Sequence, residues 1–147
     1  MIEMTFKQAL IFMPMLAVAT LTIIGFFRMV AVRLRSIRAR ATPLKYYVAF
    51  QNGAEPEHVA VVVRHYANLF EGPVLFYAAC ISVYVLGAVT TPIYLTAWAY
   101  AVCRIAQSTI HLTYNNVRHR AYAFLLGWLA MTALWIQIAI GMFAKMA

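Results

Sequence analysis

Arg64, Asn68 and Glu71 interrupt an otherwise apolar stretch and have residue types that could bind a ligand. Positions i, i+4 and i+7 lie on one face of a helix, so a cation, an amide and an anion project together. Such groups are costly beside lipid, and they normally face a bundle interior or a cavity, where they pair with something. These three side chains therefore need partners, which are either other residues or a bound molecule.

A second polar stripe repeats the pattern further along the chain. It consists of Arg104, Gln107, His111 and Asn115. Arg104 comes 14 residues before Arg118, which places it about 21 Å deeper along a helix. An unpaired arginine at that depth costs from about 2.5 to over 10 kcal/mol. Glu71 is the acidic residue at matching depth, so we expect a Glu71–Arg104 pair, within one subunit or across two. The pair either fixes helix register or belongs to a ligand site.

The two stripes together offer groups for a zwitterionic ligand. Arg64 and Arg118 are cations near one membrane face, Glu71 is an anion, and the remaining polar residues, Asn68, Gln107 and His111, form hydrogen bonds. Arginine binds carboxylates in bidentate fashion. Glutathione has two carboxylates, an ammonium and amides, and a nearby cation converts its thiol into a nucleophilic thiolate. Composition alone does not select glutathione over other zwitterions. His111 either contacts the ligand and transfers protons or is satisfied by a neighbouring helix.

The composition indicates an all-α integral membrane protein with a single domain over residues 1–147. Hydrophobic residues make up 65% of the chain, charged residues 11%, and the mean hydropathy is +0.77. Soluble domains average about 45–50% apolar and about 25% charged residues. The net charge of +8 comes largely from one loop beside a span, which favours membrane topology and anionic lipid over nucleic acid. Cys80 and Cys103 form no metal-ligand motif, so we expect no metal site.

Four transmembrane helices are expected, over about 6–32, 56–86, 92–116 and 121–143, with a basic cytoplasmic loop at about 33–55. Each span has roughly the 20 residues that a bilayer requires. Gly72-Pro73 should kink the second helix just beyond Glu71. The basic clusters place both loops in the cytoplasm and both termini on the non-cytoplasmic side. His65 and His119 are expected at the interface, without a role.

Two motifs carry a resemblance to a known family. The pattern Arg64-xxx-Asn68-xx-Glu71-x-Pro73 resembles the helix-two signature of the MAPEG proteins, membrane-associated proteins in eicosanoid and glutathione metabolism. The run from Arg104 to Arg118 resembles their helix-three signature. The similarity covers roughly residues 60–141. The amino-acid sequence within the two motifs is similar to that of a bacterial branch of the family with little assigned chemistry. A bacterial inner-membrane location is therefore expected.

The resemblance implies a four-helix bundle that assembles as a homotrimer, with glutathione between subunits near the cytoplasmic side. By position, the glutathione contacts would be Arg64, Asn68, Glu71 and Arg104. Arg118 would be the catalytic arginine that stabilises the thiolate. Arg28 and Arg33 are candidates for an additional arginine from helix one. Three positions depart from the family pattern. Many members carry His or Tyr where this chain has Gln107, and characterised enzymes carry a ligand-binding tyrosine where it has His111. Some members have an aromatic residue where it has Gly72.

Three functions follow for comparison. The first is a glutathione transferase or glutathione-dependent peroxidase, with glutathione as co-substrate and a lipophilic substrate that enters from the bilayer. The second is a non-catalytic member that binds lipid or acts as a scaffold. The third is a small proton or ion pathway, because intramembrane charge often marks one. The third is disfavoured because the charges can pair and stop short of the outer face.

Overall fold

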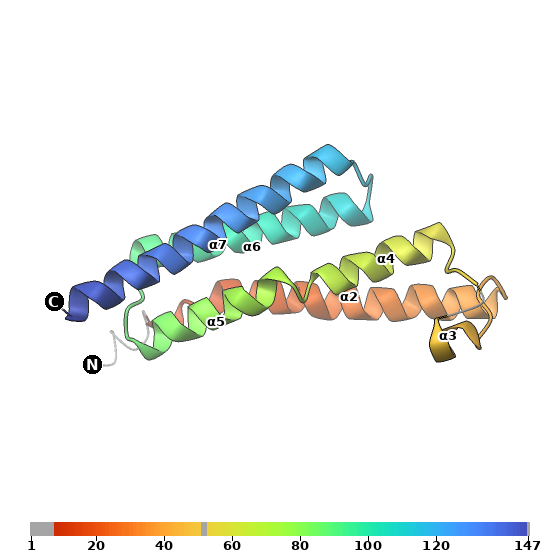
Figure 1. Cartoon of the computed structure of the whole chain (residues 1–147), viewed down its shortest axis with the longest axis horizontal. Helices are drawn as coiled ribbons and strands as arrows, with labels where there is room; N and C mark the ends of the chain where they lie inside the picture. Colours follow the sequence, from red (N-terminus) through yellow and green to blue (C-terminus); the bar gives the residue numbers. More distant parts are fainter. Residues whose placement is uncertain (1–7, 51–52, 147) are drawn as a thin grey trace.

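A computed structural model describes residues 8–50 and 53–146, and these contain helices and connections but no strand. The helices are α2 (Phe12–Arg38), α3 (Tyr46–Ala49), α4 (Glu57–Asn68), α5 (Gly72–Val85), α6 (Thr91–Leu112) and α7 (Val117–Met146). Figure 1 shows the long helices side by side along one axis. The α2–α4 and α6–α7 connections lie at one end, whereas α2 begins and α7 ends at the other.

Three helical segments are long and apolar enough to cross a membrane: Phe12–Arg38, Glu57–Val85 and Val117–Ala144. Large apolar side chains such as Leu16, Phe27, Leu129 and Ile140 are exposed along them. Such a surface is stable in lipid and costly in water. Helix α6 has 22 residues, and its buried face carries Arg104, Gln107 and His111.

The first and last long helices extend further than the sequence indicated. Helix α2 continues to Arg38 rather than ending at about residue 32, because no Gly or Pro occurs between residues 33 and 38. The expected start at residue 6 lies outside the described part of the chain. Helix α7 begins at Val117 rather than 121, since Asn116 Oδ1 accepts hydrogen bonds from the backbone N–H groups of Arg118 and His119. This is a helix N-cap, and it places Arg118 in the first turn.

Helix α6 ends at Leu112, earlier than the expected residue 116. Asn115 adopts a left-handed backbone conformation with φ 46°. Its N–H donates to the Ile110 carbonyl at 2.8 Å, which closes the helix and turns the chain toward α7. Asparagine tolerates this conformation better than most residues.

The expected single helix over 56–86 is two helices. Residues Leu69–Glu71 separate α4 from α5, so the break precedes Gly72-Pro73 rather than following Glu71 as a kink. Pro73 has no N–H, and its ring excludes the carbonyl four residues earlier, so the helix stops one turn ahead of it. A Cβ added to Gly72 would lie 2.9 Å from the Tyr100 hydroxyl oxygen. The ring of Tyr100 therefore occupies the space beside this break, stacked on Phe76.

The apolar core lies toward the end of the molecule where α2 begins. It joins side chains from four helices and includes Val18, Phe76, Val83, Ile93, Ala97, Met131 and Leu134. Toward the other end, α6 and α7 diverge from α2 and α4 (Figure 1). The packed end fixes the helices, and the divergence leaves room for a polar pocket between α4, α6 and α7.

Candidate functional site

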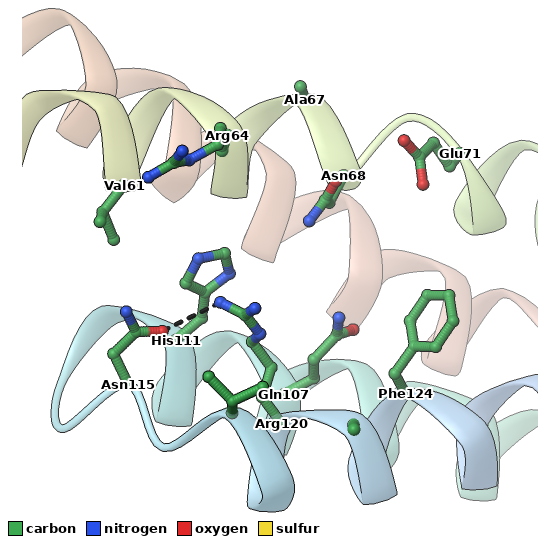
Figure 2. A pocket seen from close by; sticks show the side chains of 12 residues that line it. Val61, Arg64, Ala67, Asn68, Glu71, Gln107, His111, Asn115, Arg120 and Phe124 are labelled. Atoms are coloured by element: carbon green, nitrogen blue, oxygen red, sulfur yellow. Dashed lines mark hydrogen bonds between the residues drawn. The ribbon is translucent and has the colours of Figure 1, made fainter. Parts of the chain in front are cut away.

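The polar pocket has a volume of about 670 Å³ and lies between α4 and the α6–α7 hairpin. Its walls include Arg64, Asn68 and Glu71 on one side, and Gln107, His111, Asn115, Arg120 and Phe124 on the other. Figure 2 shows these two sets of side chains on opposite walls. The predicted stripe of Arg64, Asn68 and Glu71 thus faces the same space as three members of the second stripe, Gln107, His111 and Asn115. This space is large enough for a small organic ligand.

Arg104 lies beneath the pocket rather than in its lining. The side chain is 3% exposed. Its Nη2 donates to the backbone carbonyl of Asn68 at 2.6 Å, and its Nη1 donates to Gln107 Oε1 at 2.6 Å. The last four carbonyls of a helix have no partner within it and carry partial negative charge. Arg104 therefore satisfies the broken end of α4 and joins α4 to α6.

The expected Glu71–Arg104 ion pair is not formed within one chain. Across residues 8–50 and 53–146, the single ion pair joins Arg33 to Glu55. The helix break explains the difference, because it frees the Asn68 carbonyl to accept from Arg104. Glu71 acts on Arg104 only through space, and its exposed carboxylate remains available to a ligand.

Gln107 is held in one orientation by this contact. Arginine has only donors, so the amide oxygen of Gln107 must face Arg104 Nη1. Its NH₂ group then has two donors for other partners. Because Gln107 also lines the pocket, these donors are suited to a carbonyl or carboxylate of a ligand.

His111 is buried and packs edge-on against His65, with 5.2 Å between ring centroids. The side chain of His65, expected at the membrane interface and without a role, is buried between the helices. Neither His65 Nε2 nor His111 Nδ1 has a hydrogen-bond partner among the side chains and backbone that the structure describes. His111 also borders a second hollow of about 370 Å³ that Arg28 lines. His111 thus borders both hollows, with His65 packed against its ring.

The two arginines at the start of α7 differ in their position relative to the pocket, and the sequence did not indicate this difference. Arg118 is exposed and does not line the pocket of its own chain. Arg120 does line it, and its Nη1 donates to Asn115 Oδ1 at 3.0 Å (Figure 2). Val117, Arg120 or Ala121, and Phe124 follow helical spacing, which is the signal that could have identified Arg120.

The two helix-one candidates lie elsewhere. Arg28 Nη2 donates to the Leu112 carbonyl at 3.2 Å. Arg33 pairs with Glu55 and stacks on Tyr47. Neither side chain lines the 670 Å³ pocket. In a single chain, the arginines that line this pocket are therefore Arg64 and Arg120.

A comparison of the sequence with models of known families identifies the family of the chain. A model of the MAPEG family matches residues 11–140, which is most of the sequence. The chain belongs to the MAPEG family. Together with the long apolar helices, this membership makes it an all-α integral membrane protein. No curated protein and no solved structure matches the chain. Family membership is consistent with a glutathione-related function in a membrane.

Proposed function

We propose that this MAPEG protein binds glutathione in the pocket between α4, α6 and α7. The observation that carries the proposal is the set of charges in one cavity of about 670 Å³. Arg64 and Arg120 suit the two carboxylates, and Glu71 suits the ammonium. Asn68 and the NH₂ group of Gln107 suit the peptide groups.

The reaction we propose is conjugation of the thiolate to a lipophilic electrophile, or reduction of a lipid hydroperoxide. In conjugation, sulfur forms a bond to carbon while the leaving group departs, and the thiol proton passes to water. In reduction, two glutathione molecules become the disulfide while the hydroperoxide yields an alcohol and water. The apolar surfaces of the surrounding helices give a lipophilic substrate a route from the bilayer.

We place four spans in a bacterial inner membrane: α2, α4 with α5, α6, and α7. Helix α6 fits as the fourth, because Arg104, Gln107 and His111 are buried while the apolar side chains of Leu95, Val102 and Ile105 are exposed. Both basic connections lie at the same end of the molecule (Figure 1). The positive-inside rule makes this end cytoplasmic and leaves both termini on the other side. The pocket then opens near the cytoplasm, where glutathione is dissolved.

The proposed assembly is a homotrimer in which Arg118 acts on the glutathione of a neighbouring subunit. The support is its position, since Arg118 is exposed and lies outside the pocket of its own chain. A cyclic trimer brings the same surface of each subunit against a different surface of the next. In this arrangement Arg118 stabilises the thiolate, while Arg64, Asn68, Glu71 and Gln107 hold the tripeptide and Arg104 supports it from below.

The test is steady-state kinetics in liposomes, with glutathione and either a lipophilic electrophile or a lipid hydroperoxide. Arg120→Ala should raise the KM for glutathione about tenfold or more, because one charge-assisted hydrogen bond contributes about 1.5–3 kcal/mol. kcat should change little, since Arg120 binds both ground state and transition state. Arg35→Ala, which removes an exposed cation outside the pocket, is the matched control. Equal KM values for the two variants would contradict the assignment of the pocket. Glutathione binding without either reaction would favour the non-catalytic alternative.

A further inference from the structure

The connection between α2 and α4 folds back along α2 instead of projecting beyond it. Arg33 lies five residues before the end of α2, which is about 7.5 Å back along the helix axis. Its Nε is 2.8 Å from Glu55 Oε1, and its guanidinium carbon is 5.2 Å from the Tyr47 ring centroid. α3 is therefore held beside the last turns of α2, as Figure 1 shows.

The turn that enters this connection is also fixed. The hydroxyl groups of Ser36 and Thr42 form a buried hydrogen bond of 2.7 Å. Ala41 N–H donates to the Ser36 carbonyl at 3.0 Å. These contacts close the chain over the end of α2. Together with the contacts of Arg33, they fix the position of α3 relative to α2.

Three apolar side chains of this folded connection are exposed. Leu44 is 69% exposed, Val48 84% and Phe50 60%. We call these three residues the apolar platform. Exposed apolar area costs roughly 25 cal/mol per Å² when it faces water rather than an apolar phase. Grouped exposure of this kind marks a surface that is covered in the working protein.

Uncompensated cations flank the apolar platform. Arg35, Arg38, Arg40 and Lys45 are all exposed. None of them forms an ion pair with any residue in 8–50 or 53–146. Glu55 does not neutralise them, because Arg33 already occupies its carboxylate. The surface thus combines apolar side chains with four free positive charges.

We propose that residues 35–50, the last turn of α2 and the connection that follows it, dock on the anionic phospholipid surface of the membrane that the protein spans. The apolar platform enters the boundary between head groups and acyl chains, and the four cations bind lipid phosphates. Helix α2 has 27 residues, or about 40 Å, whereas the hydrocarbon core is about 30 Å thick. Its last turns therefore reach the head groups, and α3, folded back beside them, lies at that level. This docking does not depend on glutathione binding.

The experiment places an environment-sensitive fluorophore on Val48→Cys in a Cys103→Ala background, with the protein in lipid nanodiscs. Cys80 is fully buried and should not react. A nitroxide attached to the lipid quenches fluorophores at the head-group boundary. We expect strong quenching in nanodiscs that contain phosphatidylglycerol and weaker quenching in purely zwitterionic ones. Each basic residue near an anionic surface should favour docking about fivefold, and added salt should reduce the effect.

Two further variants make the result decisive. Phe27→Cys, on the lipid-facing side of α2, should be quenched equally in both lipids. Replacing Arg35, Arg38, Arg40 and Lys45 by glutamine should remove the dependence of the Val48 signal on anionic lipid. Full access of a water-soluble quencher to Val48 in both nanodiscs would overturn the proposal. Close approach of Val48 labels in one trimer, without lipid quenching, would also overturn it, because a second copy would then cover the platform.

Discussion

Arg118→Ala should lower kcat about 30-fold at pH 7 while leaving the affinity for glutathione nearly unchanged. A free thiol has a pKa of about 8.5, so about 3% of it is thiolate at pH 7. A neighbouring arginine that lowers the thiol pKa to about 6 raises this fraction to about 90%. Arg118 is exposed and outside the pocket of its own chain, so its removal should not disturb the residues that hold the tripeptide.

The pH dependence distinguishes this role from a structural one. In the wild-type protein the thiol is already ionised at pH 7, so kcat should hardly rise with pH. In Arg118→Ala the thiolate fraction increases as pH rises through about 8.5, so the defect should shrink to less than about twofold at pH 9. Thiolate absorbance in the ultraviolet, measured on the bound complex, should show the same shift. A defect that stays constant from pH 7 to pH 9 would contradict thiolate stabilisation by Arg118.

Mixed trimers test whether Arg118 acts across subunits. Arg118→Ala and Arg64→Ala homotrimers should each be impaired. When the two chains are co-expressed in equal amounts, about one site in four should combine an intact pocket with an intact Arg118 from its neighbour. Because each subunit interface of the trimer would hold one pocket, the activity of the mixed preparation should recover to about a quarter of the wild-type value. No recovery would place both arginines in the same chain and contradict the inter-subunit assignment.

Gln107→Leu should destabilise the protein by about 2–3 kcal/mol, because a buried charged donor then loses its acceptor. Arg104 Nη1 donates to Gln107 Oε1 at 2.6 Å, and Arg104 is 3% exposed. Leucine fills the space but accepts no hydrogen bond. The equilibrium constant for folding, measured in mixed micelles, should fall about 30- to 150-fold.

Gln107→Glu is the matched control for this substitution. The carboxylate keeps an acceptor for Arg104 and adds an opposite charge, so stability should be retained or increased. It removes the two NH₂ donors that face the pocket, so glutathione binding should weaken. Two variants of one residue thereby separate fold from binding. Equal stability of Gln107→Leu and the wild type would show that the Arg104 contact contributes little to the fold.

Much of the site could be predicted because its residues follow simple helical spacing. Arg64, Asn68 and Glu71 share one face of α4 and its end, and Gln107 and His111 share one face of α6. Polar groups in a membrane helix avoid lipid, so both faces had to turn inward. The family match over residues 11–140 agrees with the motifs that the sequence presents.

The remaining features depend on backbone and packing, which side-chain spacing does not encode. Arg104 binds the backbone carbonyl of Asn68, an acceptor that exists only because the helix breaks before Pro73. The choice between Arg118 and Arg120 depends on the rotation of α7 about its axis, which its packing against α6 fixes. His65 is buried because it meets His111 on α6, a contact between residues far apart in sequence.

Calorimetric titration of the detergent-purified protein with glutathione tests the central claim most directly. The wild type, Arg64→Ala, Glu71→Ala and the control Arg35→Ala would be titrated side by side, each shown to be folded. The account predicts binding in the micromolar-to-millimolar range for the wild type and Arg35→Ala, and no measurable binding for the two pocket variants. If the folded wild type released or absorbed no heat at several millimolar glutathione, the result would contradict the account. The polar stripes would then serve to hold a membrane bundle whose task lies elsewhere.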